Sequence, residues 1–167
     1  SPVFRFGSAA KMRNSPMHSV FSKPFTIHFS DCDSTGLVFH PHFFRWAVDT
    51  EEAFFREILG EKIFGPGVTD QIYAPMAGIQ AEFSAPLRAG DKVEFRLWIE
   101  QFGWSSIRWA FEIMKDDSPA VKIAETLVFT QLQPDGTFKA MEITENYRRK
   151  MAPYVKDDDE PGLRFRS

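Results

Sequence analysis

One short segment of the chain, residues 29–41 with the sequence FSDCDSTGLVFHP, contains the side chains best suited to chemistry. The carboxylate of Asp33 can attack a carbonyl as a nucleophile or activate a water molecule as a general base. Pro41 suits the first position of a helix, where its missing N–H does no harm. The backbone N–H of His40 then lies at a helix N-terminus, whose free N–H groups and positive dipole end stabilise an oxyanion. The segment therefore predicts attack on a carbonyl group held near His40.

Other polar residues nearby have simpler interpretations. Asp31 is expected to be a turn residue that bonds the backbone, and Cys32 to be a small buried side chain rather than a nucleophile. The imidazole of His40 remains an alternative general base. Glu51 is a second candidate for the catalytic carboxylate, although its expected place is the polar face of the helix. No third ligand at suitable spacing follows Asp31 and Asp33, so no metal site is predicted.

The rest of the chain reads as one long helix and several strands. Apolar residues at helical spacing predict a helix that begins at Pro41 and is stopped by Gly60. Strands are predicted at about residues 25–30, 79–85, 93–99, 107–113 and 121–132. Short turns between the later strands favour antiparallel neighbours. Because the apolar stripe of the helix must be covered, the predicted fold class is α+β, with a curved antiparallel sheet of about five strands wrapped around one long helix.

Length and composition predict one domain with flexible ends. The 167 residues fit a single domain, and 43% of them are apolar, which is enough for a core without a disulfide or metal. Residues 1–23 carry basic residues and no acid, and are expected to be a flexible leader: native, vector-derived or a transit peptide. Residues 24–153 form the predicted domain, and residues 154–167 a flexible, solvated tail.

Charge, hydropathy and cysteine content exclude several functional classes. The net charge is −3 and no predicted element carries a basic stripe, which argues against a nucleic-acid partner. No apolar run is long enough to span a membrane. Cys32 is the single cysteine, so no internal disulfide can form, and the chain fits a reducing, cytoplasmic compartment.

The residues from Phe29 to Trp46 resemble the 4-hydroxybenzoyl-CoA thioesterase family, a branch of the hotdog-fold enzymes. They match its acidic-x-Asp pair, its glycine three residues later at Gly36, and its short apolar run before a helix. The resemblance implies a hotdog acyl-CoA thioesterase in which Asp33 is the catalytic carboxylate and the backbone N–H of His40 polarises the thioester. It also implies that no cofactor is needed beyond the coenzyme A of the substrate. The expected assembly is a homodimer or a dimer-based homotetramer, because hotdog sites generally form between subunits.

One departure from that family bears on the acyl group. Val48 stands where the 4-hydroxybenzoyl branch has an acidic residue suited to a phenol hydroxyl. Asp49 follows one position later, and one residue on a helix is a rotation of about 100°, so its side chain faces elsewhere. An unhydroxylated aryl group or a short or medium aliphatic chain is therefore expected. Phe39 is a candidate for the wall of the acyl pocket.

A second departure concerns the coenzyme A portion of the substrate. Trp104 and Ser105 occupy a turn in which the related branch has basic residues for the phosphates. Trp104 can stack on adenine or pack at a subunit interface, and Ser105 can bond phosphate or pantetheine. Arg88, Lys92 and Arg108 are alternative phosphate contacts.

Two other functions remain open at this point. A hotdog hydratase or dehydratase pairs a helix carboxylate with a histidine, in a spacing that this sequence lacks. A non-catalytic acyl-CoA-binding domain needs no carboxylate at the thioester, so the presence of Asp33 argues against it.

Overall fold

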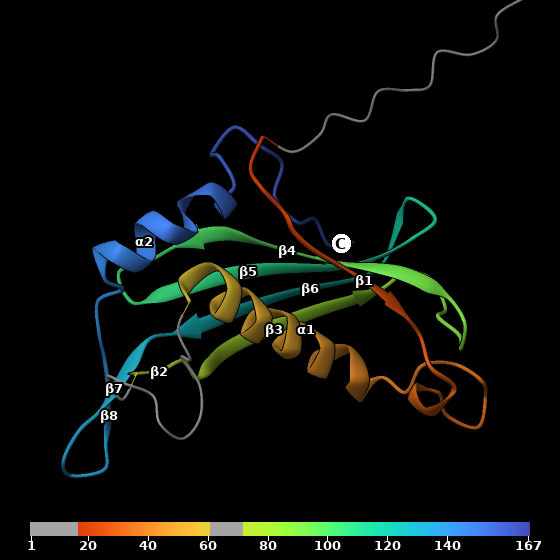
Figure 1. The fold of residues 1–167 in the computed structure, drawn as a ribbon, viewed down its shortest axis with the longest axis horizontal. Helices are drawn as coiled ribbons and strands as arrows, with labels where there is room; N and C mark the ends of the chain where they lie inside the picture. Colours follow the sequence, from red (N-terminus) through yellow and green to blue (C-terminus); the bar gives the residue numbers. More distant parts are fainter. Residues whose placement is uncertain (1–16, 61–71) are drawn as a thin grey trace, which may run out of the picture.

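The chain folds around a helix that crosses one face of an antiparallel sheet (Figure 1). The computed structural model describes residues 17–60 and 72–167. Its main sheet has five strands in the order β1-β4-β5-β6-β3. These strands are β1 (Phe21–Thr26), β3 (Met76–Phe83), β4 (Lys92–Phe102), β5 (Ser106–Lys115) and β6 (Ser118–Val128).

The other elements include the crossing helix and a small second sheet. The crossing helix α1 (Pro41–Phe54) continues into a π-helical turn (Phe55–Leu59) and ends at Gly60. The second sheet has the strand order β2-β7-β8, with β2 at Ile72–Tyr73, β7 at Thr130–Leu132 and β8 at Phe138–Ala140. A short helix, α2 (Glu145–Met151), follows it. No helix in the described part of the chain is long and apolar enough to cross a membrane.

The core lies between α1 and the sheet face that it covers. Leu97, Phe111 and Ile123 are in register across β4, β5 and β6, and all three are buried. From α1, the ring of Phe54 packs edge-on against Trp109 with their centroids 5.1 Å apart. Complete burial of each such side chain contributes about 1.5–3 kcal/mol. The predicted α+β arrangement of a curved antiparallel sheet and a helix is confirmed.

The first strand begins earlier in the sequence than predicted. It runs over Phe21–Thr26 rather than residues 25–30, and it pairs antiparallel with β4. Pro24 is tolerated because β1 is an edge strand, which can spare an N–H. The chain then leaves the sheet because residues 29–31 form a 3-10 turn. The predicted domain start at residue 24 therefore falls inside β1, and residues 1–16 of the predicted leader lie outside the described residues.

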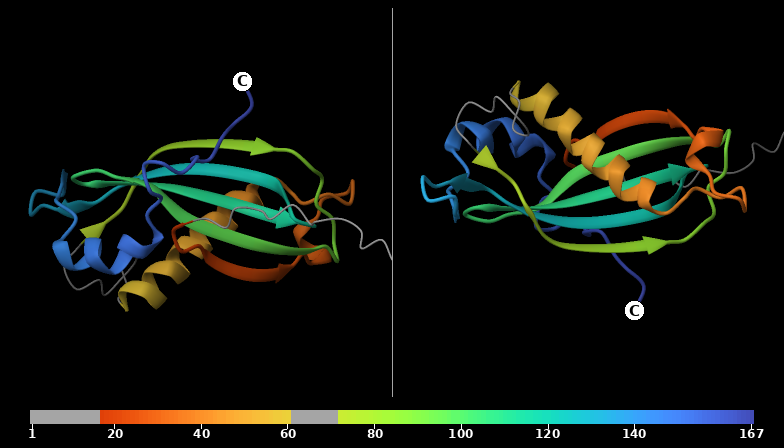
Figure 2. Two further views of the ribbon diagram at one scale, coloured as in Figure 1. Left: turned by 90° about the horizontal axis from the view of Figure 1, so that it is seen from above. Right: turned by 90° about the horizontal axis from the view of Figure 1, so that it is seen from below.

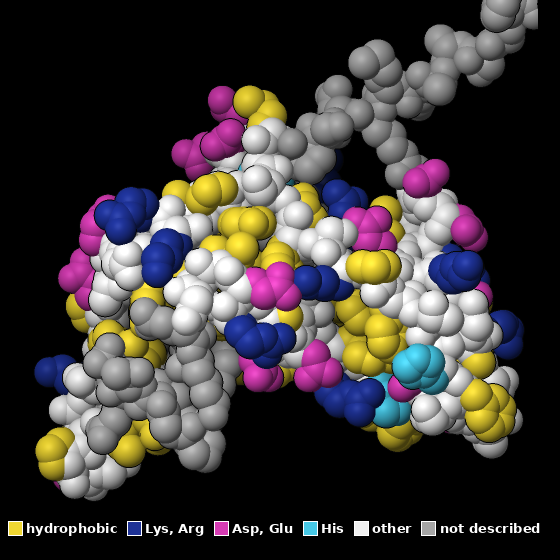
Figure 3. All heavy atoms as spheres, in the orientation of Figure 1, with side chains coloured by type: hydrophobic (Ala, Val, Ile, Leu, Met, Phe, Trp, Pro, Cys, Tyr) yellow, Lys and Arg dark blue, Asp and Glu magenta, His cyan; other side chains and the backbone are white. Residues whose placement is uncertain are grey.

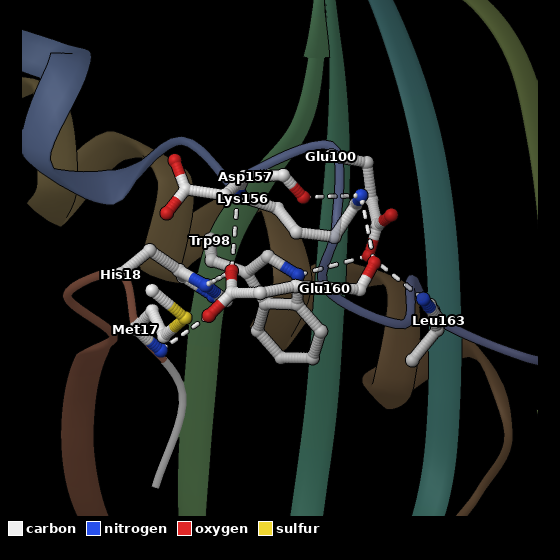
Figure 4. A network of polar contacts seen from close by, with 8 residues as sticks. All are labelled: Met17, His18, Trp98, Glu100, Lys156, Asp157, Glu160 and Leu163. Atoms are coloured by element: carbon white, nitrogen blue, oxygen red, sulfur yellow. Dashed lines mark hydrogen bonds and ion pairs between the residues drawn. The ribbon is translucent and has the colours of Figure 1, made fainter.

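The predicted tail, residues 154–167, contacts the sheet face opposite α1 (Figure 4). The N–H of Lys156 donates to the carbonyl of Ile99 at 2.8 Å, and the N–H of Leu163 to the carboxylate of Glu100 at 2.8 Å. Glu160 bonds the ring of His18 at 2.5 Å beside Trp98, so both ends of the described chain meet on β4. The flexibility of this segment stays a prediction.

Candidate active site

The turn that carries Asp33 is held by its own hydrogen bonds. Thr35 donates to Asp33 Oδ1 from its backbone N–H at 2.8 Å and from its hydroxyl at 2.5 Å. The N–H of Asp33 donates to the carbonyl of Leu37 at 2.8 Å, which closes the turn. Gly36 has a φ of +78°, a conformation that residues with a Cβ rarely adopt. The carboxylate is therefore exposed but fixed in place.

These hydrogen bonds lower the pKa of Asp33. The hydroxyl of Thr35 is the largest cause and its N–H the next, while nearby His40 contributes weakly in the same direction. The carboxylate is consequently ionised, the form that a nucleophile or a general base requires. Asp135 and Thr137 form the same pair of bonds in the turn after β7, and the pKa of Asp135 is lowered for the same reason. The lowered pKa of Asp33 thus reflects the turn, and does not by itself indicate catalysis.

Asp31 connects the loop before α1 to its neighbours. Its side chain is buried, accepts the N–H of His28 at 2.9 Å, and lies 3.7 Å from the guanidinium of Arg45 on α1. Its backbone carbonyl accepts the N–H of Phe39 at 2.9 Å. Asp31 is thus confirmed as a turn residue, and it ties the loop to α1. The described residues contain no cluster of three His, Cys, Asp or Glu side chains that could hold a metal ion.

The helix begins at Pro41, as predicted, and His40 is the residue before it. No acceptor among the described residues engages the backbone N–H of His40. Because the α1 dipole places a partial positive charge at this end, the free N–H can stabilise a developing oxyanion. The side chain of His40 is exposed.

A cavity of about 360 Å³ opens beside this helix end, lined by His40, Phe43, Phe83 and residues 84–87, among others. The rings of Phe43 and Phe83 pack against each other with their centroids 5.3 Å apart. In Figure 3, histidine side chains gather with acidic and hydrophobic ones at the end of the molecule where α1 begins. A mainly apolar cavity that ends at a helix N-terminus is suited to an apolar acyl group with a polarised carbonyl.

Comparison with known families decides the identity. A model described as the thioesterase superfamily matches residues 35–122, which is more than half of the chain. The chain belongs to the thioesterase superfamily. The predicted resemblance is confirmed at the level of the family, and the chain is a thioester hydrolase. No curated protein matches the sequence.

Solved structures of other thioesterases share the fold. A thioesterase-superfamily protein from Jannaschia sp. CCS1 has a TM-score of 0.73 at 18% identity, covering 87% of this chain and 100% of its own. The dynemicin thioesterase gives 0.70 at 19% identity, with 82% and 98% covered. A gentisyl-coenzyme A thioesterase gives 0.64 at 23% identity, with 78% and 98% covered. At these identities the likeness supports the hotdog fold, and carries no information on the substrate.

The structure brings only some of the predicted site residues of this thioester hydrolase together. Phe39 is 46% exposed and packs beside the ring of His40. Val48 lies eight residues after His40, or about 12 Å along α1, and its side chain is 43% exposed. Trp104 and Ser105 lie at the other end of the sheet, where the carbonyl of Trp104 accepts the N–H of Ile143. Since β4 spans 11 residues, or roughly 33 Å, one subunit does not bring that turn to Asp33.

Two buried glutamates correct the sequence interpretation. Glu51 was expected on the polar face of α1, but it is 2% exposed and faces Glu125 of β6, also 2% exposed. Glu51 Oε1, both carboxylate oxygens of Glu125 and the indole N–H of Trp109 have no hydrogen-bond partner in the described part of the chain. The sequence spacing indicates the burial of Glu51, because Glu51 follows Phe43 and Ala47 at intervals of four and so shares their face of the helix. Glu125 likewise follows Ile123 and precedes Leu127 at intervals of two, so it lies on the same buried face of β6.

Burial favours the protonated form of the two carboxyl groups. Burial is the main reason that the pKa of Glu51 lies well above its usual range, and the neighbouring Glu125 adds to it. Burial also raises the pKa of Glu125. Two ionised carboxylates without a cation are costly in such a setting, so the pair favours a protonated form.

This pair predicts a pH-dependent stability. A raised folded-state pKa means that folding takes up a proton, so this contribution to stability is full below the ordinary value of 4.5 and is lost as pH rises through the raised pKa. We expect Glu51→Gln to raise the free energy of unfolding by about 1–3 kcal/mol over the native chain at pH 8, because glutamine takes up no proton on folding and one pKa unit is worth about 1.4 kcal/mol. The increase should be smaller at pH 5. Urea unfolding at both values measures the difference.

Glu52→Gln is the matched control for that experiment. Glu52 is the next residue of α1 and is exposed, and within residues 17–60 and 72–167 its carboxylate pairs only with Arg56, at 3.8 Å. Its substitution should change stability by less than about 0.5 kcal/mol at either pH. Equal behaviour of the two variants would show that the protonation of Glu51 is not linked to folding.

Proposed function

We propose that this chain hydrolyses acyl-CoA thioesters, with Asp33 as the catalytic carboxylate and the N–H of His40 as the group that polarises the thioester carbonyl. The observation that carries the proposal is the ionised, exposed carboxylate of Asp33 in the turn that leads into α1. Asp33 does not itself line the cavity, but its N–H is bonded to Leu37, which lines the cavity together with His40. Both parts are needed for attack on a thioester: a carboxylate in its anionic form and a donor for the oxyanion.

Two routes use the same residues. As a nucleophile, Asp33 forms a bond from its carboxylate oxygen to the carbonyl carbon, the thiolate of coenzyme A leaves, and water hydrolyses the mixed anhydride. As a general base, it takes a proton from water while the water oxygen attacks the same carbon, and the thiolate then leaves. A thiolate is a good leaving group, so neither route needs a strong general acid. In both routes the free acid and coenzyme A are the products.

The acyl group is proposed to be aryl and unhydroxylated, or a short or medium aliphatic chain. Phe43 and Phe83 supply the apolar wall of the cavity, and Val48 places no hydrogen-bonding group farther along α1. The cavity of about 360 Å³ is at the small end of the range for ligand sites. Phe39 is proposed to line the same space from the exposed side.

The active form is proposed to be a cytoplasmic homodimer or dimer-based homotetramer. Strand β3 is at the edge of the five-stranded sheet, and its Ile79 and Phe83 side chains are 43% and 49% exposed. An exposed edge strand with apolar side chains is a template for pairing with a second chain. A partner there would lie next to the cavity, because Phe83 belongs to both surfaces.

Replacement of Asp33 tests the catalytic role. Asp33→Asn keeps an oxygen that can accept the bonds of Thr35 but removes the negative charge, so the turn should survive. We expect kcat to fall about 10²–10⁴-fold, or more if Asp33 is a nucleophile, with little change in KM or melting temperature. Steady-state thiol release and thermal melts measure these quantities.

Asp135→Asn is the matched control, because Asp135 makes the same two bonds in a turn away from the cavity. It should leave kcat unchanged. The catalytic proposal is wrong if Asp33→Asn retains near-native kcat as Asp135→Asn does.

Val48 is predicted to set the preference for the acyl group. The native protein should hydrolyse benzoyl-CoA at least as well as 4-hydroxybenzoyl-CoA. Val48→Asp should shift the ratio of their kcat/KM values about 10-fold toward the phenol, because one hydrogen bond to a charged group contributes about that much free energy. Asp49→Asn is the control and should leave the ratio unchanged. A native preference for the hydroxylated substrate that Asp49→Asn abolishes would contradict this assignment.

The assembly can be measured by light scattering at micromolar concentration. We expect a mass at least twice the 19.2 kDa of one chain. Ile79→Lys should lower that mass, because it places a charge on the exposed edge strand. Phe138→Lys, at a 57% exposed position of β8, should not lower it. A native monomer would rule out the proposed assembly.

A further inference from the structure

A second cavity, of about 480 Å³, opens on the sheet face opposite α1. Its walls include Glu82 and Ser84 from the end of β3, Lys122 of β6, and Arg164 and Arg166 of the C-terminal segment. That segment runs over the sheet toward the β3 edge, as both views of Figure 2 show. The cavity therefore lies between the C-terminal segment and the end of β3.

The cavity carries a surplus of positive charge. Among the lining side chains, three cations, Lys122, Arg164 and Arg166, face one carboxylate, Glu82, which leaves two positive charges. Glu112 of β5, outside the lining, pairs in register with Lys122 and offsets part of its charge. The pKa of Glu82 is lowered, mainly by the hydrogen bond from the backbone N–H of Arg166. Glu82 is therefore counted as a negative charge. Asp116 and Asp117, in the adjoining turn, are exposed and do not line the cavity.

Hydrogen bonds and ion pairs hold the segment in this position. Lys122 Nζ donates to the carbonyl of Arg164 at 2.9 Å and lies 3.7 Å from Glu82 Oε1. The N–H of Arg166 donates to the other oxygen of Glu82 at 2.5 Å, and its Nε lies 3.7 Å from the first. The guanidinium of Arg164 forms no ion pair within the described chain and is exposed. Both arginines thus present donors to solvent over the cavity.

The two cavities share two lining residues just after the end of β3. Ser84 and Ala85 line both of them, one on each face of the sheet edge. A molecule bound with its carbonyl at His40 would reach the arginines by the route over Ser84. The turn of Trp104 and Ser105, the predicted contact for coenzyme A, lies at the other end of the sheet in the same subunit.

We propose that the cavity of Lys122, Arg164 and Arg166 binds the phosphate groups of the substrate's coenzyme A, with the pantetheine arm passing over Ser84 and Ala85. The inference rests on the proposed function, and it adds the residues that recognise the nucleotide. Guanidinium groups bind phosphate through paired, charge-assisted hydrogen bonds, and the nucleotide of coenzyme A carries several phosphate charges. Arg164 and Arg166 are accordingly binding residues and take no part in the chemical step.

The test compares two thioesters of the same acid on the full chain. Benzoyl-CoA carries the phosphates, and benzoyl-pantetheine lacks them. For the double variant Arg164→Glu with Arg166→Glu, we expect the KM for benzoyl-CoA to rise about 10-fold or more, as the loss of charge-assisted hydrogen bonds implies. The kcat for both thioesters and the KM for benzoyl-pantetheine should stay unchanged.

A charge-matched double variant, Lys139→Glu with Arg149→Glu, is the control. Both residues are exposed and lie outside the cavity, so the KM for benzoyl-CoA should stay near the native value. An equal rise in both double variants would reduce the effect to net charge and overturn the proposal. So would an unchanged KM ratio between the two thioesters in the arginine variant.

Calorimetry with adenosine 3′,5′-bisphosphate separates this inference from the proposed function. The native chain should bind this nucleotide, the arginine variant should bind it about 10-fold more weakly or worse, and added salt should weaken native binding. If the native chain hydrolyses neither thioester, the proposed function fails while nucleotide binding still tests the cavity. If hydrolysis proceeds but the arginine variant binds the nucleotide as the native chain does, only the inference fails.

Discussion

The packing of α1 against the sheet determines where the chemistry can occur. Two aromatic contacts fix the position of α1 along the sheet and its rotation. Phe54 packs edge-on against Trp109, and the ring centroids of Trp46 and Phe95 are 5.4 Å apart. Because α1 is fixed, its first turn lies at one end of the sheet, with the free N–H of His40 beside the cavity. The turn of Asp33 is short and self-bonded, so it can only lie next to that helix end. The proposed site therefore follows from core packing.

The molecule places carboxylates in two opposite environments. Asp33 is exposed and hydrogen-bonded, so it stays ionised and can react with a substrate. Glu51 and Glu125 are buried against each other in the layer between α1 and the sheet, so they favour a protonated form. A protonated carboxyl is a poor nucleophile, which favours Asp33 over Glu51 for attack on a thioester. The same physical effect, the solvation of charge, thus separates a candidate catalytic group from a structural one.

The sequence predicted the features that depend on local pattern, and missed those that depend on which distant segments meet. Helical spacing and Pro41 were enough to predict the start of α1, and the period of two was enough for β4 and β5. The start of β1 at Phe21 was missed because Pro24 interrupts its pattern and only its pairing with β4 defines it. The contact of Arg164 and Arg166 with β3 and β6 joins residues more than forty positions apart, as in the bond from Lys122 to Arg164. No spacing rule predicts such a contact.

On the proposed mechanism the chain cleaves the thioester bond of acyl-CoA rather than only binding the molecule. The most direct measurement is the release of free thiol from benzoyl-CoA and a panel of aliphatic acyl-CoAs, followed together with binding of the same compounds. We expect free coenzyme A and the carboxylic acid to appear in equal amounts, with turnover highest for unhydroxylated aryl or short and medium aliphatic groups. Tight binding without thiol release, across the whole panel, would contradict the proposed mechanism and identify an acyl-CoA-binding domain instead.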